Sequence, residues 1–295
     1  MALVATLVAN PLNPAIGSTL AERVAEALKA SGLYWLADGI ACDIALKDGT
    51  GKQAARQTIA EMVGEAPIDI VIQEVETRRK KLLLADMDST MIGQECIDEL
   101  ADVLGLKEPV AAITARAMND EIEFEPALRE RVALLKGLSA DVVDGVIAER
   151  ITLTPGGRTL VATMRAFGAY TALVSGGFTV FTNPIAKKLG FNENRANILN
   201  VSEGRFDGTV AEPILGRQAK VDALIDLCGK LGVEEADALA VGDGANDLGM
   251  IERAGTGVAL HAKPAVAERA DIRIDHADLT ALLYIQGYRK TDFVE

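Results

Sequence analysis

The sequence feature that most constrains the fold is a short, wholly apolar run, Leu82–Leu84, that is followed closely by two carboxylates, Asp86 and Asp88. An unbroken apolar run of this length is typical of a parallel strand that is buried on both faces of a sheet. Because side chains alternate along a strand, a spacing of two predicts that both carboxylates point the same way. Open parallel sheets bind ligands at the carboxyl ends of their strands, so we expect part of a binding site here.

The paired carboxylates predict metal-assisted chemistry. Two like charges held close together need a cation, and hard oxygen ligands beside a phosphate suit Mg²⁺. A carboxylate attacks phosphorus poorly unless the phosphoryl oxygens are neutralised, which makes Asp86 a candidate nucleophile of the aspartyl-phosphate type. A pair of aspartates alone also fits a solvated turn or a helix cap, so this interpretation depends on partners elsewhere in the chain.

The remainder of the chain predicts an α/β fold. After residue 154, strands expected at 170–174 and 238–241 alternate with helices expected at 158–167 and 218–231. This alternation is typical of a doubly wound parallel sheet. Residues 94–150 instead have helical patterns throughout, which predicts a helical cap inserted over about residues 92–152. Such a lid can exclude water and select the substrate.

Residues 1–77 show the order β-α-β-β-α-β that is typical of a small ferredoxin-like α+β module. We expect strands over 3–9, 33–37, 40–46 and 68–75, and helices over 19–30 and 52–63, the first capped by Ser18. The module resembles the ACT regulatory domain, a resemblance that implies amino-acid binding or dimer formation. Its first loop, residues 10–14, does not carry the Asp-Arg-Pro-Gly type of turn that is usual in that family. Ligand binding and a purely dimerising or vestigial role therefore both remain open, and a homodimer through this module is one expectation.

Two further segments offer partners for the aspartate pair. Ser175 and Gly176 are expected to end a second strand at the start of a helix, where free N–H groups and the helix dipole favour a phosphoryl group. Lys220, near the start of its helix, can reach a phosphate as a point charge. Taken singly, the first also fits an ordinary turn and the second a solvated side chain.

A third apolar strand leads into the loop Gly242-Asp243-Gly244-Ala245-Asn246-Asp247. Acidic residues after a strand can complete an octahedral Mg²⁺ shell, and Asn246 can hydrogen-bond within it. The same loop would also satisfy a plain polar turn. It is the ordered combination of all these segments, at one edge of one sheet, that indicates a metal and phosphate site.

That ordered set resembles the haloacid dehalogenase-type phosphatase superfamily over about residues 80–283. The Asp-Met-Asp-Ser-Thr run from Asp86, the helix from Leu128 to Leu135 and the Leu-Val-Ser-Gly-Gly-Phe run resemble its phosphoserine phosphatase family. The resemblance implies a haloacid dehalogenase-like core, Mg²⁺ as cofactor and O-phospho-L-serine as substrate. It also implies a final step of serine biosynthesis in which phosphoserine yields serine and phosphate.

The resemblance assigns roles by position. Asp86 is expected to attack phosphorus, and Asp88 to act as general acid and then as general base. The expected metal ligands are Asp86, the Asp88 backbone carbonyl and Asp243. The remaining phosphate-side residues are Ser175, Gly176 and Lys220 on the phosphoryl oxygens, with Asn246 and Asp247 in support.

The substrate's ammonium and carboxylate groups require an acid and a base, which the resemblance places at Glu95 and Arg131. Helical spacing supports Arg131, which falls at the edge of an apolar face, whereas Arg129 points away. Met118 and Phe124 are expected to line the pocket. Two other functions remain open: transfer of the phosphoryl group to an alcohol acceptor such as homoserine, and an amino-acid sensor with an inactive phosphatase body.

The overall charge limits the partners. The chain has 30 basic and 43 acidic residues, a net charge of −13, which disfavours a nucleic acid or an anionic membrane as the main partner. We find no signal-peptide pattern and no apolar stretch near the roughly 20 residues that span a bilayer. Three scattered cysteines are too few for a disulfide framework. We therefore expect a cytoplasmic protein.

Overall fold

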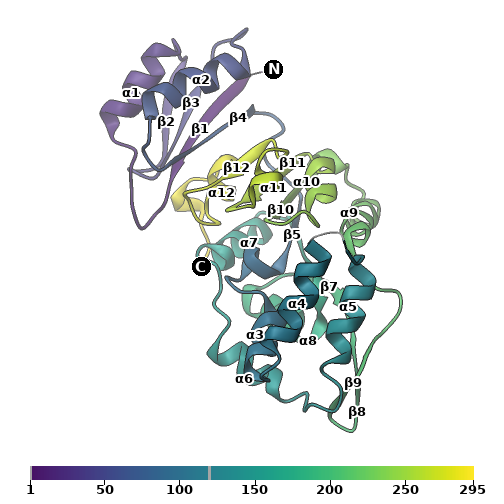
Figure 1. The fold of residues 1–295 in the computed structure, drawn as a ribbon. Helices are drawn as coiled ribbons and strands as arrows, with labels where there is room; N and C mark the ends of the chain where they lie inside the picture. Colours follow the sequence, from purple (N-terminus) through teal and green to yellow (C-terminus); the bar gives the residue numbers. More distant parts are fainter. Residues whose placement is uncertain (1, 119–120) are drawn as a thin grey trace.

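Two lobes of different architecture make up the computed structural model, which describes residues 2–118 and 121–295 (Figure 1). The first lobe contains an antiparallel sheet, and the larger one a parallel sheet with helices around it. Each sheet has a hydrophobic cluster of its own, and a third cluster contains residues of both sheets. The predicted combination of a small α+β module and an α/β body is therefore confirmed.

The N-terminal module, residues 3–74, has the predicted element order. Its elements are β1 (Leu3–Ala9), α1 (Ser18–Ala27), β2 (Gly32–Ala37), β3 (Ala41–Ala45), α2 (Lys52–Val63) and β4 (Ile68–Glu74). The strands pair antiparallel in the order β2-β3-β1-β4. One prediction is wrong: Ser18 is the first residue of α1 rather than its cap, because Gly17 occupies the cap position in extended backbone.

The larger lobe is built on a parallel sheet with the strand order β12-β11-β10-β5-β6-β7. Its strands are β5 (Leu82–Ala85), β6 (Tyr170–Phe178), β7 (Glu193–Asn197), β10 (Ala238–Gly242), β11 (Thr256–Leu260) and β12 (Ile272–Ile274). β5 lies near the centre, and Leu82, Leu83 and Leu84 have no exposed surface. Leu82 and Leu84 join one hydrophobic cluster and Leu83 another, so the strand is buried on both faces as predicted.

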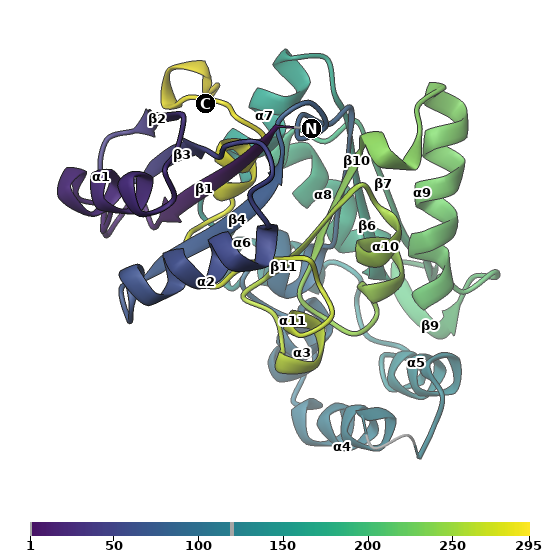
Figure 2. The ribbon, with the colours of Figure 1, turned by 90° about the horizontal axis from the view of Figure 1, so that it is seen from above.

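Helices cover both faces of this sheet (Figure 2). They are α7 (Gly157–Ala166), α8 (Thr179–Leu189), α9 (Arg217–Leu231), α10 (Leu248–Arg253), α11 (Pro264–Ala267) and α12 (Ala281–Ile285). Side chains of α9 and α10 pack with Leu82 and Leu84, whereas those of α7, α8 and α12 pack with Leu83. The doubly wound arrangement is therefore confirmed.

A helical insertion follows β5 and occupies the lower part of Figure 1. It consists of α3 (Cys96–Val103), α4 (Lys107–Met118), α5 (Phe124–Ala133) and α6 (Val142–Glu149), and the hairpin β8 (Leu199–Ser202) and β9 (Arg205–Val210) lies beside it. An antiparallel bridge between Ile92 and Leu153 joins the two ends of the insertion.

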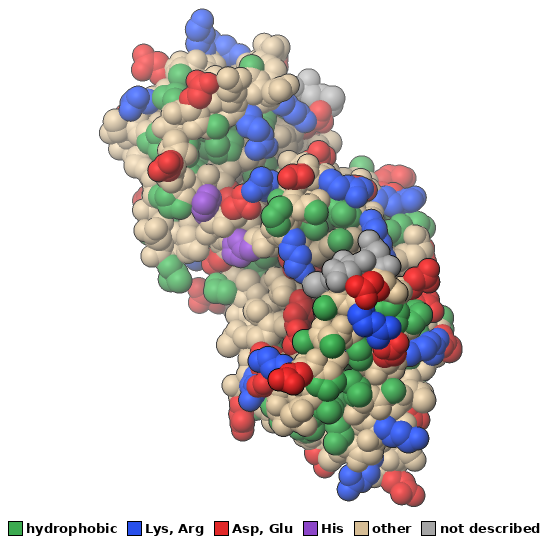
Figure 3. Space-filling model, viewed as in Figure 1, with side chains coloured by type: hydrophobic (Ala, Val, Ile, Leu, Met, Phe, Trp, Pro, Cys, Tyr) green, Lys and Arg blue, Asp and Glu red, His purple; other side chains and the backbone are tan. Residues whose placement is uncertain are grey.

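Polar contacts join the two lobes directly. The buried Asp69 carboxylate of β4 accepts hydrogen bonds from the Asp275 and Ala277 backbone N–H groups, both at 2.8 Å. Arg78 forms an ion pair with Asp43 of β3 at 2.7 Å. In Figure 3, charged side chains of both signs are interspersed over the two lobes, and the histidines lie near their junction. Among the described helices, none is long and apolar enough to cross a membrane.

Candidate active site

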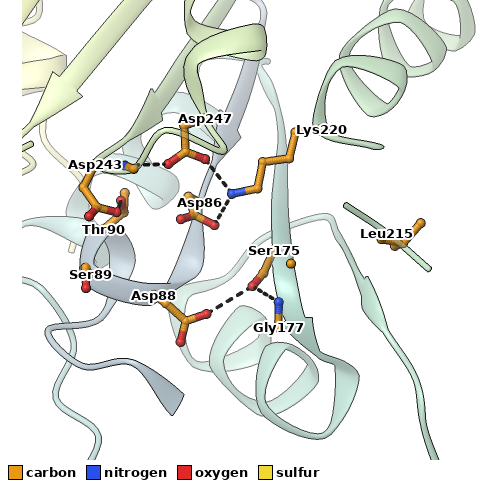
Figure 4. Close-up of polar contacts among 12 residues, drawn as sticks. Asp86, Asp88, Ser89, Thr90, Ser175, Gly177, Leu215, Lys220, Asp243 and Asp247 are labelled. Atoms are coloured by element: carbon orange, nitrogen blue, oxygen red, sulfur yellow. Dashed lines mark hydrogen bonds and ion pairs between the residues drawn. The ribbon is translucent and has the colours of Figure 1, made fainter. Parts of the chain in front are cut away.

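A buried lysine and two buried aspartates form the centre of the candidate site (Figure 4). Lys220 Nζ lies 2.5 Å from Asp86 Oδ1 and 2.5 Å from Asp247 Oδ1. Burial alone would lower the pKa of Lys220, but the two carboxylates outweigh it and raise that pKa above its ordinary value. Lys220 is 2% exposed, so it is not the solvated lysine that the sequence also allowed.

Burial and the neighbouring Asp247 raise the pKa of Asp86 well above its ordinary value, although Lys220 opposes them. Asp86 directly follows β5 and is 4% exposed. A carboxylate in such surroundings is stabilised in its ionised form mainly by the lysine. The ionised form of the Asp86 carboxyl group at this strand end therefore depends mainly on Lys220.

Three buried carboxylates, those of Asp86, Asp243 and Asp247, each bring one oxygen within 4.8 Å of the others. Both oxygens of Asp247 are engaged, one by Lys220 and the other by the Gly244 N–H at 3.0 Å. Asp86 and Asp243 each keep one oxygen that has no hydrogen-bond partner among the described residues. Burial and Asp247 raise the pKa of Asp243 to about 6. Such an oxygen-only, under-neutralised set suits a hard divalent cation.

Two glycines allow the loop after β10 to close in this way. A Cβ atom at Gly242 would lie 2.3 Å from Asp247 Cγ, and one at Gly244 would lie 2.3 Å from Asn246 Oδ1. Sequence reasoning treated these glycines only as turn residues. Their spacing around Asp243 was the available signal that the chain folds tightly back on itself.

Asp88 reaches the site by a route that strand alternation did not predict. β5 ends at Ala85, and Asp88 lies in a wide helical turn, Met87–Met91, in which Ser89 has a φ of 55°. Asp88 Oδ1 accepts a hydrogen bond from the Cys96 N–H at 2.8 Å, and Oδ2 accepts one from Ser175 Oγ at 3.2 Å. The two carboxylates therefore have separate partners, and the prediction that Asp88 belongs to the end of the strand is wrong, because it lies in the turn that follows β5.

Burial, followed by the charge of Glu95, raises the pKa of Asp88 to about 6. The side chain is partly exposed, unlike Asp86, and it stands outside the group of three carboxylates. A carboxyl group with this pKa gains and loses a proton readily near neutral pH.

The Ser175-Gly176-Gly177 segment is extended backbone rather than the start of a helix. β6 continues to Phe178 and α8 begins at Thr179, so the expected helix N-terminus at Ser175 and Gly176 is wrong. Ser175 Oγ accepts a hydrogen bond from the Gly177 N–H at 2.8 Å. A Cβ at Gly177 would lie 3.2 Å from Asp88 Oδ2, so glycine keeps this edge of the site open.

The insertion contributes charged groups with few partners. Glu95 stands at the N-cap position of α3 without a side-chain capping bond, is exposed, and accepts a hydrogen bond from Ser89 Oγ at 2.8 Å. Burial lowers the pKa of the half-buried Arg131, although Asp98 and Glu95 oppose the shift. Arg131 forms no ion pair with any carboxylate in the described part of the chain. Arg129, by contrast, forms an ion pair with Glu212.

Phe124 closes over the same region from α5. Its ring lies 3.6 Å from the position of a Cβ at Gly176 and 3.3 Å from that of a Cβ at Gly216, and 39% of the residue is exposed. The prediction for Met118 concerns a side chain outside the described part of the structure. Asn246 is exposed, and its amide forms no hydrogen bond with another described residue.

Two residues at the site were missed from the sequence. Thr90, fully buried, donates a hydrogen bond from Oγ1 to Asp243 Oδ1 at 3.3 Å. The Lys263 backbone N–H donates to the Asp243 carbonyl at 3.2 Å, and its ammonium group lowers the pKa of Asp243. Thr90 lies four residues after Asp86, whereas nothing in the sequence near Lys263 indicates its position beside Asp243.

Comparison with known proteins assigns the geometry to a family. Residues 83–252 match the family described as haloacid dehalogenase-like hydrolase. A phosphoserine phosphatase of Polaromonas sp. is 42% identical over 221 residues, which cover 73% of this chain and 94% of that protein. A phosphoserine phosphatase of Streptomyces coelicolor is 36% identical over 97% of this chain and 71% of its own length. The unliganded structure of a probable phosphoserine phosphatase from Vibrio cholerae has a TM-score of 0.78 and 30% identity, and the match covers 99% of this chain and 88% of that one.

Proposed function

The chain belongs to the haloacid dehalogenase-like hydrolases, among the phosphoserine phosphatases, and we propose that it hydrolyses O-phospho-L-serine to L-serine and phosphate with Asp86 as nucleophile. The observation that carries this proposal is the buried Asp86 carboxylate, held by Lys220 at 2.5 Å beside the separately held Asp88. One group is placed to attack, and the other to move a proton.

The donor set fits Mg²⁺. Asp86 and Asp243 each have a free carboxylate oxygen, whereas both oxygens of Asp247 are occupied, which supports Asp86 and Asp243 as ligands and Asp247 as their support. We also assign the Asp88 backbone carbonyl to the metal. When bound, Mg²⁺ would neutralise phosphoryl oxygens and offset the excess negative charge of the three carboxylates.

In the first step Asp86 attacks phosphorus, and the bond from phosphorus to the serine oxygen breaks. One oxygen of Asp86 attacks, and the other is the one that would hold the metal. Lys220, which is bonded to Asp86 Oδ1, also faces the incoming phosphoryl oxygens with its ammonium group. Ser175 and Gly176 bind the same phosphoryl group from the other side. Asp88 gives its proton to the departing serine oxygen, and its pKa of about 6 suits that transfer.

In the second step a water molecule attacks the aspartyl-phosphate. Asp88, now ionised, takes a proton from this water as the water oxygen bonds to phosphorus. The bond between phosphorus and the Asp86 oxygen breaks, which frees the Asp86 carboxylate and releases inorganic phosphate. The Cys96 N–H contact holds Asp88 in place through both steps, while the single Ser175 hydroxyl proton turns from Asp88 to the phosphoryl group when that group binds. One carboxyl group thus alternates between acid and base, as microscopic reversibility requires.

The insertion, about residues 92–152, would act as the cap that selects the substrate. Glu95 has one carboxylate oxygen that is not used by Ser89, and Arg131 lacks a carboxylate partner among the described residues. These free charges suit the ammonium and the carboxylate of phosphoserine. Phe124 would cover the phosphate side, and Asn246 would contact the substrate from the loop after β10.

The test is phosphate release from phosphoserine, phosphothreonine, phosphoethanolamine and p-nitrophenyl phosphate, with Mg²⁺ and with EDTA. We expect a strong preference for phosphoserine that EDTA abolishes. Equal rates on all four would retain a phosphatase but reject the substrate assignment. A new phosphorylated product when homoserine is added would instead identify a phosphotransferase.

A further inference from the structure

Asn197, the last residue of β7, is a buried amide at the edge of the candidate site. It is 2% exposed. Its Nδ2 donates hydrogen bonds to the Gly176 carbonyl at 2.8 Å and to the Leu215 carbonyl at 3.1 Å, while its Oδ1 accepts one from the Leu215 N–H at 2.7 Å. A buried amide that uses three bonds on two backbone segments fixes the separation of those segments.

The hydrogen bonds of Asn197 lie at the point where the regular pairing of β6 and β7 is interrupted. β6 and β7 pair in register as far as Val174 and Arg195, and the register then shifts so that Phe178 faces Asn197. Residues 175–177 therefore lie outside the regular ladder. Gly176 is only partly buried, but its carbonyl has lost its strand neighbour at this shift. The Asn197 side chain donates to that carbonyl in place of the neighbouring strand.

The second segment leads to the lysine. Leu215 precedes Gly216, the N-cap of α9, and Lys220 is the fourth residue of that helix. Figure 4 shows Leu215 beyond Ser175 and Lys220, on the side away from Asp243. Asn197 thus joins the backbone that carries Ser175 to the backbone that leads into Lys220.

The same two segments support the cap. The Phe124 ring lies against Gly176, whose carbonyl Asn197 bonds, and against Gly216, which follows Leu215. A change in the separation of these segments would alter the surface that Phe124 covers and the space between Ser175 and Lys220.

We propose that Asn197 is a positioning residue for the phosphoryl group, which sets the distance between Ser175–Gly176 and Lys220 by clamping their backbones together. This inference rests on the proposed function, which assigns those residues to the phosphoryl oxygens. It adds a residue that touches neither substrate nor metal. Its effect should fall on phosphate binding and on the rate, and not on recognition of the serine end.

Asn197→Asp is the sharpest variant, because it keeps the size and the acceptor for the Leu215 N–H but turns a donor toward two carbonyls into a third acceptor. We expect kcat to fall by about 10- to 100-fold for both phosphoserine and p-nitrophenyl phosphate. Calorimetry should show about tenfold weaker binding of inorganic phosphate in the presence of Mg²⁺, while L-serine inhibits with an unchanged constant. Asn200→Asp is the matched control, since the side chain of Asn200 in β8 bonds Thr209 at the surface, and it should change none of these values.

Unchanged kcat and phosphate affinity in a folded Asn197→Asp protein would overturn the inference, as would an equal loss of phosphate and L-serine binding. If that variant does not fold, Asn197→Ser, which is neutral and too short to reach both segments, is measured in its place against the same expectations. Phosphate binding and p-nitrophenyl phosphate hydrolysis do not depend on the serine end. A wild-type protein that is inactive on phosphoserine would therefore reject the proposed substrate and still allow the Asn197 test.

Discussion

The two walls of the candidate active site differ in how far their charged groups are already paired without a ligand. We call the residues of the parallel-sheet body the core wall and those of the helical insertion the cap wall. On the core wall, Asp86, Lys220 and Asp247 are almost fully buried and bound to one another at 2.5 Å. On the cap wall, Glu95 is exposed and Arg131 has no ionic partner among the described residues. The core wall is a preorganised electrostatic site, whereas the cap wall keeps its charges free for a ligand.

Under the proposed function, this difference predicts that the core wall governs reactivity and the cap wall the choice of substrate. A preorganised buried charge network stabilises developing charge without reorganising, so changes there should affect every substrate. Free charges on a cap act only on a ligand that carries matching groups. Changes there should therefore distinguish phosphoserine from substrates without an ammonium and a carboxylate.

The largest effect is expected from Asp86→Asn. The amide cannot attack phosphorus, so phosphate release from both phosphoserine and p-nitrophenyl phosphate should fall by at least about 1000-fold. Asp237→Asn is the control, because Asp237 pairs with Lys81 outside the site and its loss should leave the rates nearly unchanged. An Asp86→Asn protein with more than about a tenth of the wild-type rate would show that another group is the nucleophile.

A smaller and selective effect is expected from Arg131→Ala. Loss of a charge-assisted hydrogen bond to the substrate carboxylate should lower kcat/KM for phosphoserine by about 10- to 100-fold and leave p-nitrophenyl phosphate within about threefold. Arg129→Ala, two residues away on the same helix but paired with Glu212, is the matched control. An equal decrease in kcat/KM for both substrates would contradict the proposal that the two walls have separate roles.

The core wall was also the part that the sequence predicted best. Apolar strands that end in polar residues locate Asp86, Ser175 and Asp243, because the carboxyl ends of parallel strands meet at one edge of a sheet. The pattern failed where local backbone departs from regular structure. Asp88 lies in a wide turn and not on the strand, and Ser175 lies in extended backbone and not at a helix start.

Residues of the cap wall were harder to predict from the sequence. Helical spacing placed Arg131 at the edge of an apolar face, but Glu95 came only from family resemblance, because it precedes its helix as a cap. Asn197 was not predicted at all. Its role depends on a register shift between two strands, and such a shift has no residue pattern of its own.

The raised pKa of Asp243, about 6, predicts that the free energy of unfolding of the metal-free protein depends on pH. The folded protein keeps this proton up to about pH 6, whereas the unfolded chain releases it near pH 4. Between these values the folded state binds more protons, so the free energy of unfolding decreases as pH rises, by on the order of 2 kcal/mol for this group.

Urea unfolding at pH 4.5 and at pH 7, in EDTA, measures this loss. Asp243→Asn should show less of it, and the difference between the two proteins removes the contribution of other groups. Mg²⁺ should restore stability to the wild type at pH 7, because it binds the ionised carboxylates. If both metal-free proteins lost the same unfolding free energy between the two pH values, Asp243 would not be the cause of that loss.

The smallest effect concerns a contact that crosses between the walls, the hydrogen bond from Ser89 Oγ to Glu95 Oε1 at 2.8 Å. Ser89 belongs to the turn that also carries Asp88, so it orients Glu95 from the core side. Ser89→Ala should raise KM for phosphoserine by about two- to tenfold with little change in kcat, since an exposed hydrogen bond contributes modestly. Ser139→Ala, on an exposed loop, is the control. A decrease in kcat for p-nitrophenyl phosphate would instead place Ser89 with the reactive wall, because only a disturbed Asp88 would slow a substrate that Glu95 does not recognise.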